Sequence, residues 1–160
     1  MIRTFEKKDA IAVADLAKKT FAACNAGDYY DYSGVEKTLS SFDAAQHSEQ
    51  ELFDTLNSTE IFFVYEENEN IIGMIRGRKN RIHSMFVDGV HQNKGIGRSL
   101  IEKFEQSAIA QGSTHIEIHA SLTAAAFYEK MGYEKLGDIC DFEGLKIYNM
   151  RKEFGKRGNP

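Results

Sequence analysis

A glycine-containing turn between a strand and a helix constrains the fold of this chain more than any other feature. The segment 85–100, MFVDGVHQNKGIGRSL, begins with strand-forming residues and then carries the pattern Gln92-x-x-Gly95-x-Gly97 in front of an amphipathic helix. Glycines at this junction let the backbone approach a ligand closely, and the first turn of a helix has backbone N–H groups without intrahelical acceptors. The pattern therefore predicts an anion-binding turn.

Length and charge set the class of protein. With 160 residues, of which 42% are hydrophobic, the chain is long enough for one core, so we expect a single domain over residues 1–160. A net charge of −4 argues against a nucleic-acid partner, because binding phosphates requires clustered Lys and Arg. Cys24 and Cys140 share no metal-type spacing with histidines, so we expect free thiols and no metal. Without a charged-then-apolar leader or an apolar run of about 20 residues, a cytoplasmic protein that does not bind membranes is expected.

Strand and helix patterns alternate along the chain and predict an α/β domain around a mixed sheet. Asp9 is expected to cap the first helix, and a strand-rich hairpin surrounds the turn at 67–70. The segment 138–144 has no clear pattern and is expected to be a turn region. The expected elements are a strand at 1–5, a helix at about 9–23, a helical region at 34–56, hairpin strands at 61–66 and 71–77, a strand at 82–87, a helix from the glycine turn to Gly112, a strand at 115–120, a helix at 124–131 and a last strand at 147–154.

Other glycine-rich phosphate sites fit the turn less well. A P-loop requires Lys-Ser or Lys-Thr after its last glycine, whereas Lys94 precedes Gly95 here. A dinucleotide-binding fingerprint requires Gly or Ala at the position of Leu100, although Glu117 does lie at about the expected distance of 20 residues. The P-loop is excluded, and the dinucleotide site remains as a weaker alternative.

A second motif follows in the segment HIEIHASLTAAAFYEKMGY, where Tyr128, Gly132 and Tyr133 form a Tyr-x-x-x-Gly-Tyr pattern. Together with the Gln-x-x-Gly-x-Gly turn, in this order, the chain resembles the GNAT superfamily of acyl-CoA-dependent N-acetyltransferases. The resemblance covers residues 61–154 as an acyl-CoA-binding core, with acceptor-side helices at about 9–56. It implies a mostly antiparallel sheet whose central parallel strand pair splays apart, flanked by helices.

The resemblance implies that acetyl-CoA is the co-substrate. Its pyrophosphate would be bound by N–H groups between about Gln92 and Gly97, and its pantetheine arm would pair with the strand 85–87 beside the splay. Two departures from the family pattern are Ser121, where many members have Asn, and Asn93, where Gly is frequent; Asn tolerates turn geometry. The residues expected to bind the cofactor are Met85, Phe86, Val87, Gln92, Asn93, Lys94, Gly95, Ile96, Gly97, Arg98, Ser99, Ser121, Phe127 and Tyr128.

Acetyl transfer requires a neutral amine and a proton for the departing thiolate. By resemblance, Tyr128 occupies the position of the general acid. His83 lies where several members carry the base and could act through a water, while a purely structural role for this histidine stays open. Glu117 and His119 share one face of the next strand and are reserve candidates for the base.

The acceptor is the least determined part of the prediction. In the family, the first two helices and their connecting loop form the acceptor side, and here that loop contains Tyr29, Tyr30 and Tyr32 between acidic residues. Acidic and aromatic groups together favour a cationic amine of a small molecule or peptide, although the loop could equally be an ordinary surface turn. The alternative function is an acyl-CoA-binding module that senses the thioester without turnover. A homodimer is compatible with the sequence but not required by it.

Overall fold

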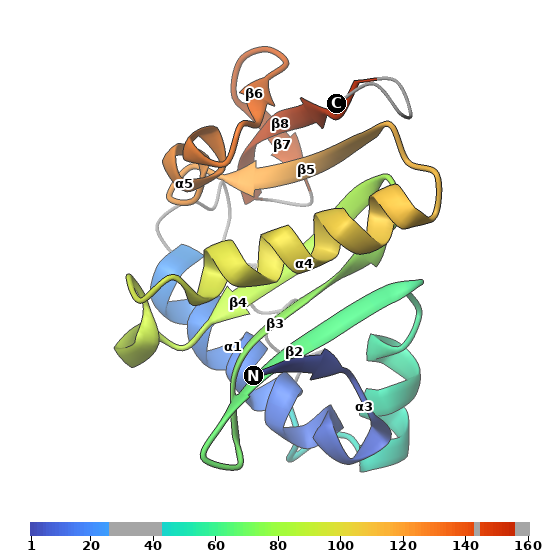
Figure 1. Cartoon of the computed structure of the whole chain (residues 1–160). Helices are drawn as coiled ribbons and strands as arrows, with labels where there is room; N and C mark the ends of the chain where they lie inside the picture. Colours follow the sequence, from blue (N-terminus) through green and yellow to red (C-terminus); the bar gives the residue numbers. More distant parts are fainter. Residues whose placement is uncertain (26–42, 143–144, 156–160) are drawn as a thin grey trace.

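Eight strands form one twisted sheet (Figure 1). The computed structural model describes residues 1–25, 43–142 and 145–155, and only the backbone of residues 21–25. The path of neighbouring strands is β1-β2-β3-β4-β5-β8-β6, with β7 also paired to β8, and β4–β5 is the only parallel pair among the described strands. The strands are β1 (Ile2–Thr4), β2 (Ile61–Glu67), β3 (Asn70–Arg78), β4 (Arg81–Val87), β5 (His115–Ser121), β6 (Glu134–Lys135), β7 (Cys140–Phe142) and β8 (Leu145–Glu153).

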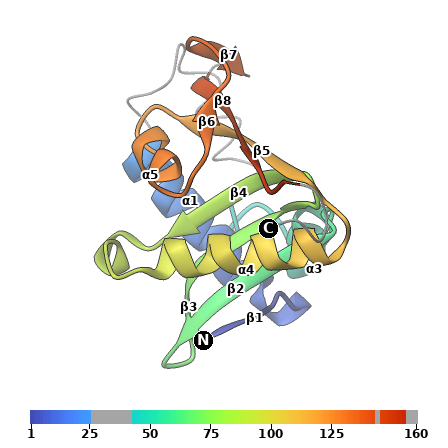
Figure 2. The same cartoon turned by 45° about the horizontal axis from the view of Figure 1, so that its top comes forward.

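Helices cover both faces of the sheet. Helices α1 (Ala10–Asn25) and α3 (Glu49–Leu56) lie on one face, and α4 (Ile96–Ala110) lies on the other, across β2 and β3 (Figure 2). Each face has its own apolar core, because α4 presents Leu100, Ile101 and Phe104 to the sheet while α1 and α3 bury their own apolar stripes. The short helix α5 (Ala125–Lys130) follows β5. This is the mixed, mostly antiparallel α/β fold that the sequence predicted.

Three details differ from the sequence prediction. Asp9 does not cap α1; it ends a 3₁₀ turn, η1 (Lys7–Asp9), where its carboxylate accepts from the Glu6 amide at 2.9 Å and from both terminal nitrogens of Arg3 at 2.8 Å. Of the helical region predicted at 34–56, the described part 43–48 is not helical, because Ser48 caps α3 by accepting from the Glu51 amide. Within 138–144, the predicted turn region, Cys140–Phe142 forms β7.

A β-bulge in β4 ends its pairing with β5. Gly77 of β3 pairs with Ile82 and Arg76 pairs with Ser84, so His83 has no partner residue in this ladder. An extra residue of this kind bends a strand and increases its twist. Accordingly, β4 pairs with β5 only at Arg81↔Glu117 and Ile82↔Ile118, and the two strands diverge beyond that point. The splayed parallel pair implied by the family resemblance is confirmed.

Gly77 makes the bulge sterically feasible. A Cβ atom at this position would lie 2.1 Å from the carbonyl oxygen of Arg81 and 2.9 Å from the Cα of Ile82. Real Cβ atoms do not approach backbone this closely, so only glycine fits against the bulged strand. The bulge also changes the side-chain alternation, since Ile82 and Met85 both pack against the core beneath α4 although they are three residues apart.

Candidate active site

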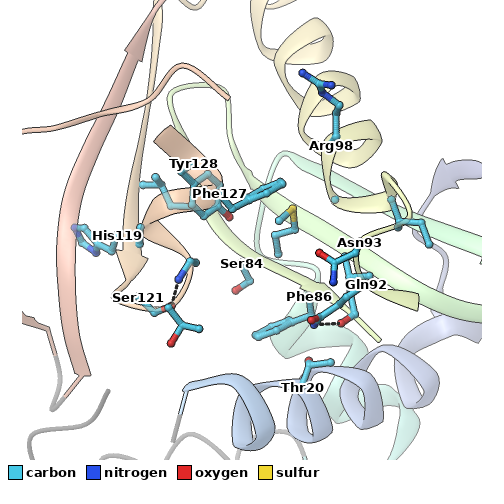
Figure 3. Close-up of a pocket in the computed structure, with 18 of the residues that line it drawn as sticks. Thr20, Ser84, Phe86, Gln92, Asn93, Arg98, His119, Ser121, Phe127 and Tyr128 are labelled. Carbon is cyan, nitrogen blue, oxygen red and sulfur yellow. Dashed lines mark hydrogen bonds between the residues drawn. The ribbon is translucent and has the colours of Figure 1, made fainter. Parts of the chain in front are cut away.

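The splay between β4 and β5 opens into a pocket of about 500 Å³. Figure 3 shows that it extends from the N-terminus of α4, at Arg98, past Tyr128 and Phe127 to Thr20 on α1. Of the residues predicted to bind the cofactor, Lys94 and Ser99 do not line this pocket, and the other twelve do. His83 and the reserve candidate His119 also line it, whereas Glu117 does not. Tyr29, Tyr30 and Tyr32 lie outside the described residues.

Positive backbone φ angles shape the turn before α4. Gly95 is the N-cap of α4 with φ +83°, and Asn93 has φ +65°. Asparagine is one of the few residues other than glycine that adopts this left-handed conformation readily, which explains how Asn93 fits where glycine is frequent. Helix geometry leaves the amide groups of the first turn of α4 without intrahelical acceptors, and this turn borders the pocket.

Because Gly97 has no side chain, a narrow space stays open between the start of α4, Phe127 and Met85. A Cβ atom there would lie 3.3 Å from Cζ of Phe127 and 3.6 Å from Cε of Met85. A larger side chain would therefore fill space between α4, α5 and β4. A slot of this kind fits a thin chain such as the β-alanine and cysteamine part of a pantetheine arm.

The Gln92 backbone amide is engaged within the turn itself. It donates to the Gly89 carbonyl at 3.3 Å, closing the 3₁₀ turn η3 (Gly89–His91). The Gln92 side-chain amide donates to the Val87 carbonyl at 3.0 Å and so connects the turn to the end of β4. Asp88 accepts from the Val90 amide and pairs with Lys19 of α1 at 3.0 Å. Gln92 thus acts on the shape of the turn, and the amides following it remain the better candidates for an anion.

Tyr128 presents its hydroxyl from a buried position. Its side chain is 4% exposed, and its ring makes edge contacts with Phe127 and Tyr133 at centroid distances of 5.3 and 5.7 Å. The hydroxyl makes no hydrogen bond to any of the described residues, although the residue lines the pocket. Burial raises the pKa of Tyr128 well above its usual value, so the hydroxyl is protonated at neutral pH.

His83 and His119 lie on the two diverging strands, one residue beyond the last β4–β5 pair. Partial burial lowers the pKa of His83, and the nearby guanidinium groups of Arg76, Arg78 and Arg81 lower it further. Burial also lowers the pKa of His119, whose ring packs against Phe142 at a centroid distance of 4.4 Å. Both imidazoles are therefore largely neutral at pH 7 and can accept a proton.

Glu117 is held in ion pairs instead of facing the pocket. Its two carboxylate oxygens accept from Arg81 at 2.9 Å and from Arg151 at 3.0 Å. Both oxygens are therefore engaged on the sheet, and the side chain does not line the pocket. The geometry therefore favours His83 over Glu117 as a candidate base, and His119 remains second because its ring is packed against β7.

The sequence interpretation missed a buried polar cluster behind Tyr128. Tyr133 donates to Oε2 of Glu105 at 2.9 Å, and Lys152 contacts both oxygens of the same carboxylate at 3.1 and 3.2 Å. Glu105 is only 8% exposed. The sequence did contain a signal for this cluster, because Glu105 lies on the apolar face of α4, about two helical turns after Gly97. Thr20 and Ser84 were also missed as pocket residues.

The described residues contain no group of three or more His, Cys, Asp or Glu side chains arranged to hold a metal ion. In the same part of the chain, no helix combines the length and apolar character needed to cross a membrane.

Comparison with known proteins defines the class. A family model described as acetyltransferase (GNAT) domain matches residues 27–154. The chain belongs to the GNAT family of acetyltransferases, and the resemblance drawn from the two sequence motifs is confirmed.

The individual relatives are distant. Human N-acetyltransferase 8 is 29% identical over 89 residues, which is 48% of this chain and 39% of that protein. A GCN5-related N-acetyltransferase structure from Rhodopseudomonas palustris has a TM-score of 0.78 at 21% identity and covers 96% of this chain and 94% of its own. The PaiA N-acetyltransferase from Thermoplasma acidophilum, solved in complex with coenzyme A, has a TM-score of 0.72 at 18% identity, covering 96% and 98%. At these identities the solved structures show a shared fold.

Proposed function

We propose that this protein is an N-acetyltransferase that moves the acetyl group of acetyl-CoA to a primary amine by direct attack within a ternary complex. The observation that carries this proposal is a single pocket, open through the β4–β5 splay, that connects the turn before α4 to Tyr128 and His83. Each end of the pocket offers a different chemistry. The α4 end favours an anion, and the splay holds a proton donor and a proton acceptor.

Several features of the site support acetyl-CoA as the co-substrate. The amides that open α4 favour the pyrophosphate through their N–H groups and the helix dipole. Past Ile82, the edge of β4 is not paired with β5, so it can accept an extended pantetheine arm as an additional strand partner. Coenzyme A is bound in the related PaiA structure, whose fold this chain shares.

The transfer step balances with groups from this chain. The amine nitrogen attacks the thioester carbonyl, forming a C–N bond as the C–S bond breaks. The proton lost by the amine passes to His83, directly or through a water, and the sulfur takes a proton from the Tyr128 hydroxyl. No oxidant, metal or second cofactor is needed.

The pKa directions agree with these roles. A tyrosine whose pKa is raised by burial is protonated at neutral pH, so its hydroxyl can donate a hydrogen bond to the sulfur as negative charge builds there and supply a proton as the C–S bond breaks. A histidine whose pKa is lowered is unprotonated at neutral pH and ready to accept.

The proposal is tested by measuring thiol release and product mass with acetyl-CoA and a panel of primary amines. Binding of acetyl-CoA is measured in parallel by isothermal titration calorimetry. We expect saturable binding, and thiol release that depends on the amine with a matching gain of one acetyl group in its mass. Saturable binding without release for any amine would instead identify an acyl-CoA-binding module, and stronger binding of a dinucleotide would identify that alternative class.

A further inference from the structure

Three arginines gather beside His83 on the face of the sheet that carries α1 and α3. Arg76 and Arg78 lie two residues apart on β3 and so share a face, and the strand register places Arg78 opposite Arg81 of β4. Met74 of the same face packs in the α1 and α3 core. The bulged residue His83 lies next to this group, where β4 leaves β5. We call Arg76, Arg78 and Arg81 the arginine cluster.

Two of the three positive charges in the arginine cluster are not balanced by a carboxylate of the described residues. Arg81 pairs with Glu117 at 2.9 Å. Arg76 instead donates to the backbone carbonyl of Leu56 at 2.9 Å, and its Nε is buried without a hydrogen-bond partner. Arg78 is exposed and forms no ion pair with any carboxylate among the described residues. This imbalance is local, because the whole chain has a net charge of −4.

The charge imbalance has a direct effect on any acceptor. The guanidinium groups of the cluster exert a positive electrostatic field on His83. An amine that reaches the thioester beside His83 enters the same field. A polycation is repelled there, since like charges at close range raise the free energy of the bound state. An oxyanion is attracted, and guanidinium groups bind carboxylates and phosphates through paired N–H donors.

We propose that the acceptor is a primary amine that also carries a carboxylate or a phosphate, and that the arginine cluster binds this oxyanion while the amine faces His83. The inference rests on the proposed function and adds the substrate class. It differs from the cationic acceptor that the sequence of the loop at Tyr29–Tyr32 suggested. The cluster would also help the chemistry, because a positive field lowers the pKa of the acceptor ammonium and increases the fraction of neutral nucleophile.

Matched acceptor pairs test the proposal with the full chain and saturating acetyl-CoA. β-Alanine is compared with β-alaninamide, and phosphoethanolamine with ethanolamine, so that each pair differs in its oxyanion. Spermidine serves as the polycation. The quantity measured is kcat/KM from thiol release, expressed as the ratio within each pair.

We expect the wild-type ratio to favour an oxyanion-bearing acceptor and Arg78→Gln to lower that ratio by about tenfold, the usual effect of one charge-assisted hydrogen bond. Arg78 is exposed, so this variant is expected to keep its fold, which thermal unfolding checks. The matched control is Lys103→Gln, which removes the same charge from the exposed surface of α4 on the opposite face and should leave the ratio unchanged. The pair with the larger ratio distinguishes carboxylate from phosphate.

The outcomes separate this inference from the proposed function. Equal or faster turnover of spermidine or the uncharged partners would keep the acetyltransferase assignment and overturn the oxyanion. The same holds if Arg78→Gln and Lys103→Gln change the ratio equally. If acetyl-CoA binds but no probe and no amine of the wider panel releases thiol, the proposed function fails and the inference fails with it.

Discussion

At the residue scale, the central assignment is Tyr128 as the proton donor. Replacing it in Tyr128→Phe removes one oxygen and keeps the ring contacts to Phe127 and Tyr133. We expect kcat to fall by about 10²-fold or more, the usual contribution of a positioned acid, while the dissociation constant for acetyl-CoA stays nearly the same. Steady-state kinetics and calorimetry on the same preparation measure both quantities.

Tyr133→Phe is the matched control for this variant. It also removes one buried tyrosine hydroxyl, but this hydroxyl donates to Glu105, and Tyr133 does not line the pocket. Tyr133→Phe should lower the free energy of unfolding by about 1 kcal/mol and reduce kcat less than Tyr128→Phe does. Equal losses of kcat in the two variants would contradict a specific chemical role for Tyr128.

The pH dependence of turnover tests His83. Its pKa is lowered from the usual histidine value of about 6.5, so the reactive neutral form prevails above that pH and is lost as the pH falls through the lowered pKa. We therefore expect kcat/KM to be level near pH 7 and to decrease below about pH 6.5. In His83→Gln the rate should be lower and this acid limb should disappear. An unchanged limb in the variant would assign it to another group, with His119 the next to test.

At the element scale, the bulge in β4 produces the gap that the site requires. In Gly77→Ala the new methyl group would collide with the Arg81 carbonyl, so either β3 or the bulge must shift. We expect a loss of about 1–3 kcal/mol in the free energy of unfolding, together with weaker acetyl-CoA binding because the splay changes. Urea denaturation and calorimetry measure the two effects.

Gly89→Ala is the control for the bulge. The space around a Cβ atom at Gly89 is open for at least 4 Å, and the residue lies in the exposed turn η3. This variant should unfold at the same urea concentration as the wild type. If Gly77→Ala behaves in the same way, the steric account of the bulge is wrong.

Local patterns predicted the elements well wherever one segment carries its own signal. The strand, glycine turn and helix at 85–112 are formed as predicted, because turn geometry and helix periodicity are properties of neighbouring residues. The bulge at His83 could not be predicted, since it exists only in the register between β3 and β4. The misplaced cap at Asp9 has a similar origin, because Arg3 of β1 draws that carboxylate into a bidentate pair.

At the scale of the whole molecule, the order of elements predicted the mixed sheet and the two motifs predicted the family, but neither predicted the charges around His83. Arg76, Arg78 and Arg81 are unremarkable as sequence, and they become a cluster only when the β3–β4 hairpin aligns them beside His83. Glu117 was a candidate base in the sequence because the ion pairs that its carboxylate forms with Arg81 and Arg151 depend on the neighbouring strands. Charge interactions across strands therefore had to come from the structure.

Calorimetric titration of acetyl-CoA into the wild type, Gly97→Leu and Gly137→Leu tests the central claim most directly. Leucine at position 97 would fill the slot between Phe127 and Met85, whereas position 137 is exposed with open space around it. The account predicts one-to-one binding by the wild type and Gly137→Leu, and a loss of affinity of at least about tenfold, or 1.4 kcal/mol, in Gly97→Leu. Undiminished binding by Gly97→Leu would contradict the claim that acetyl-CoA occupies the gap between β4 and β5.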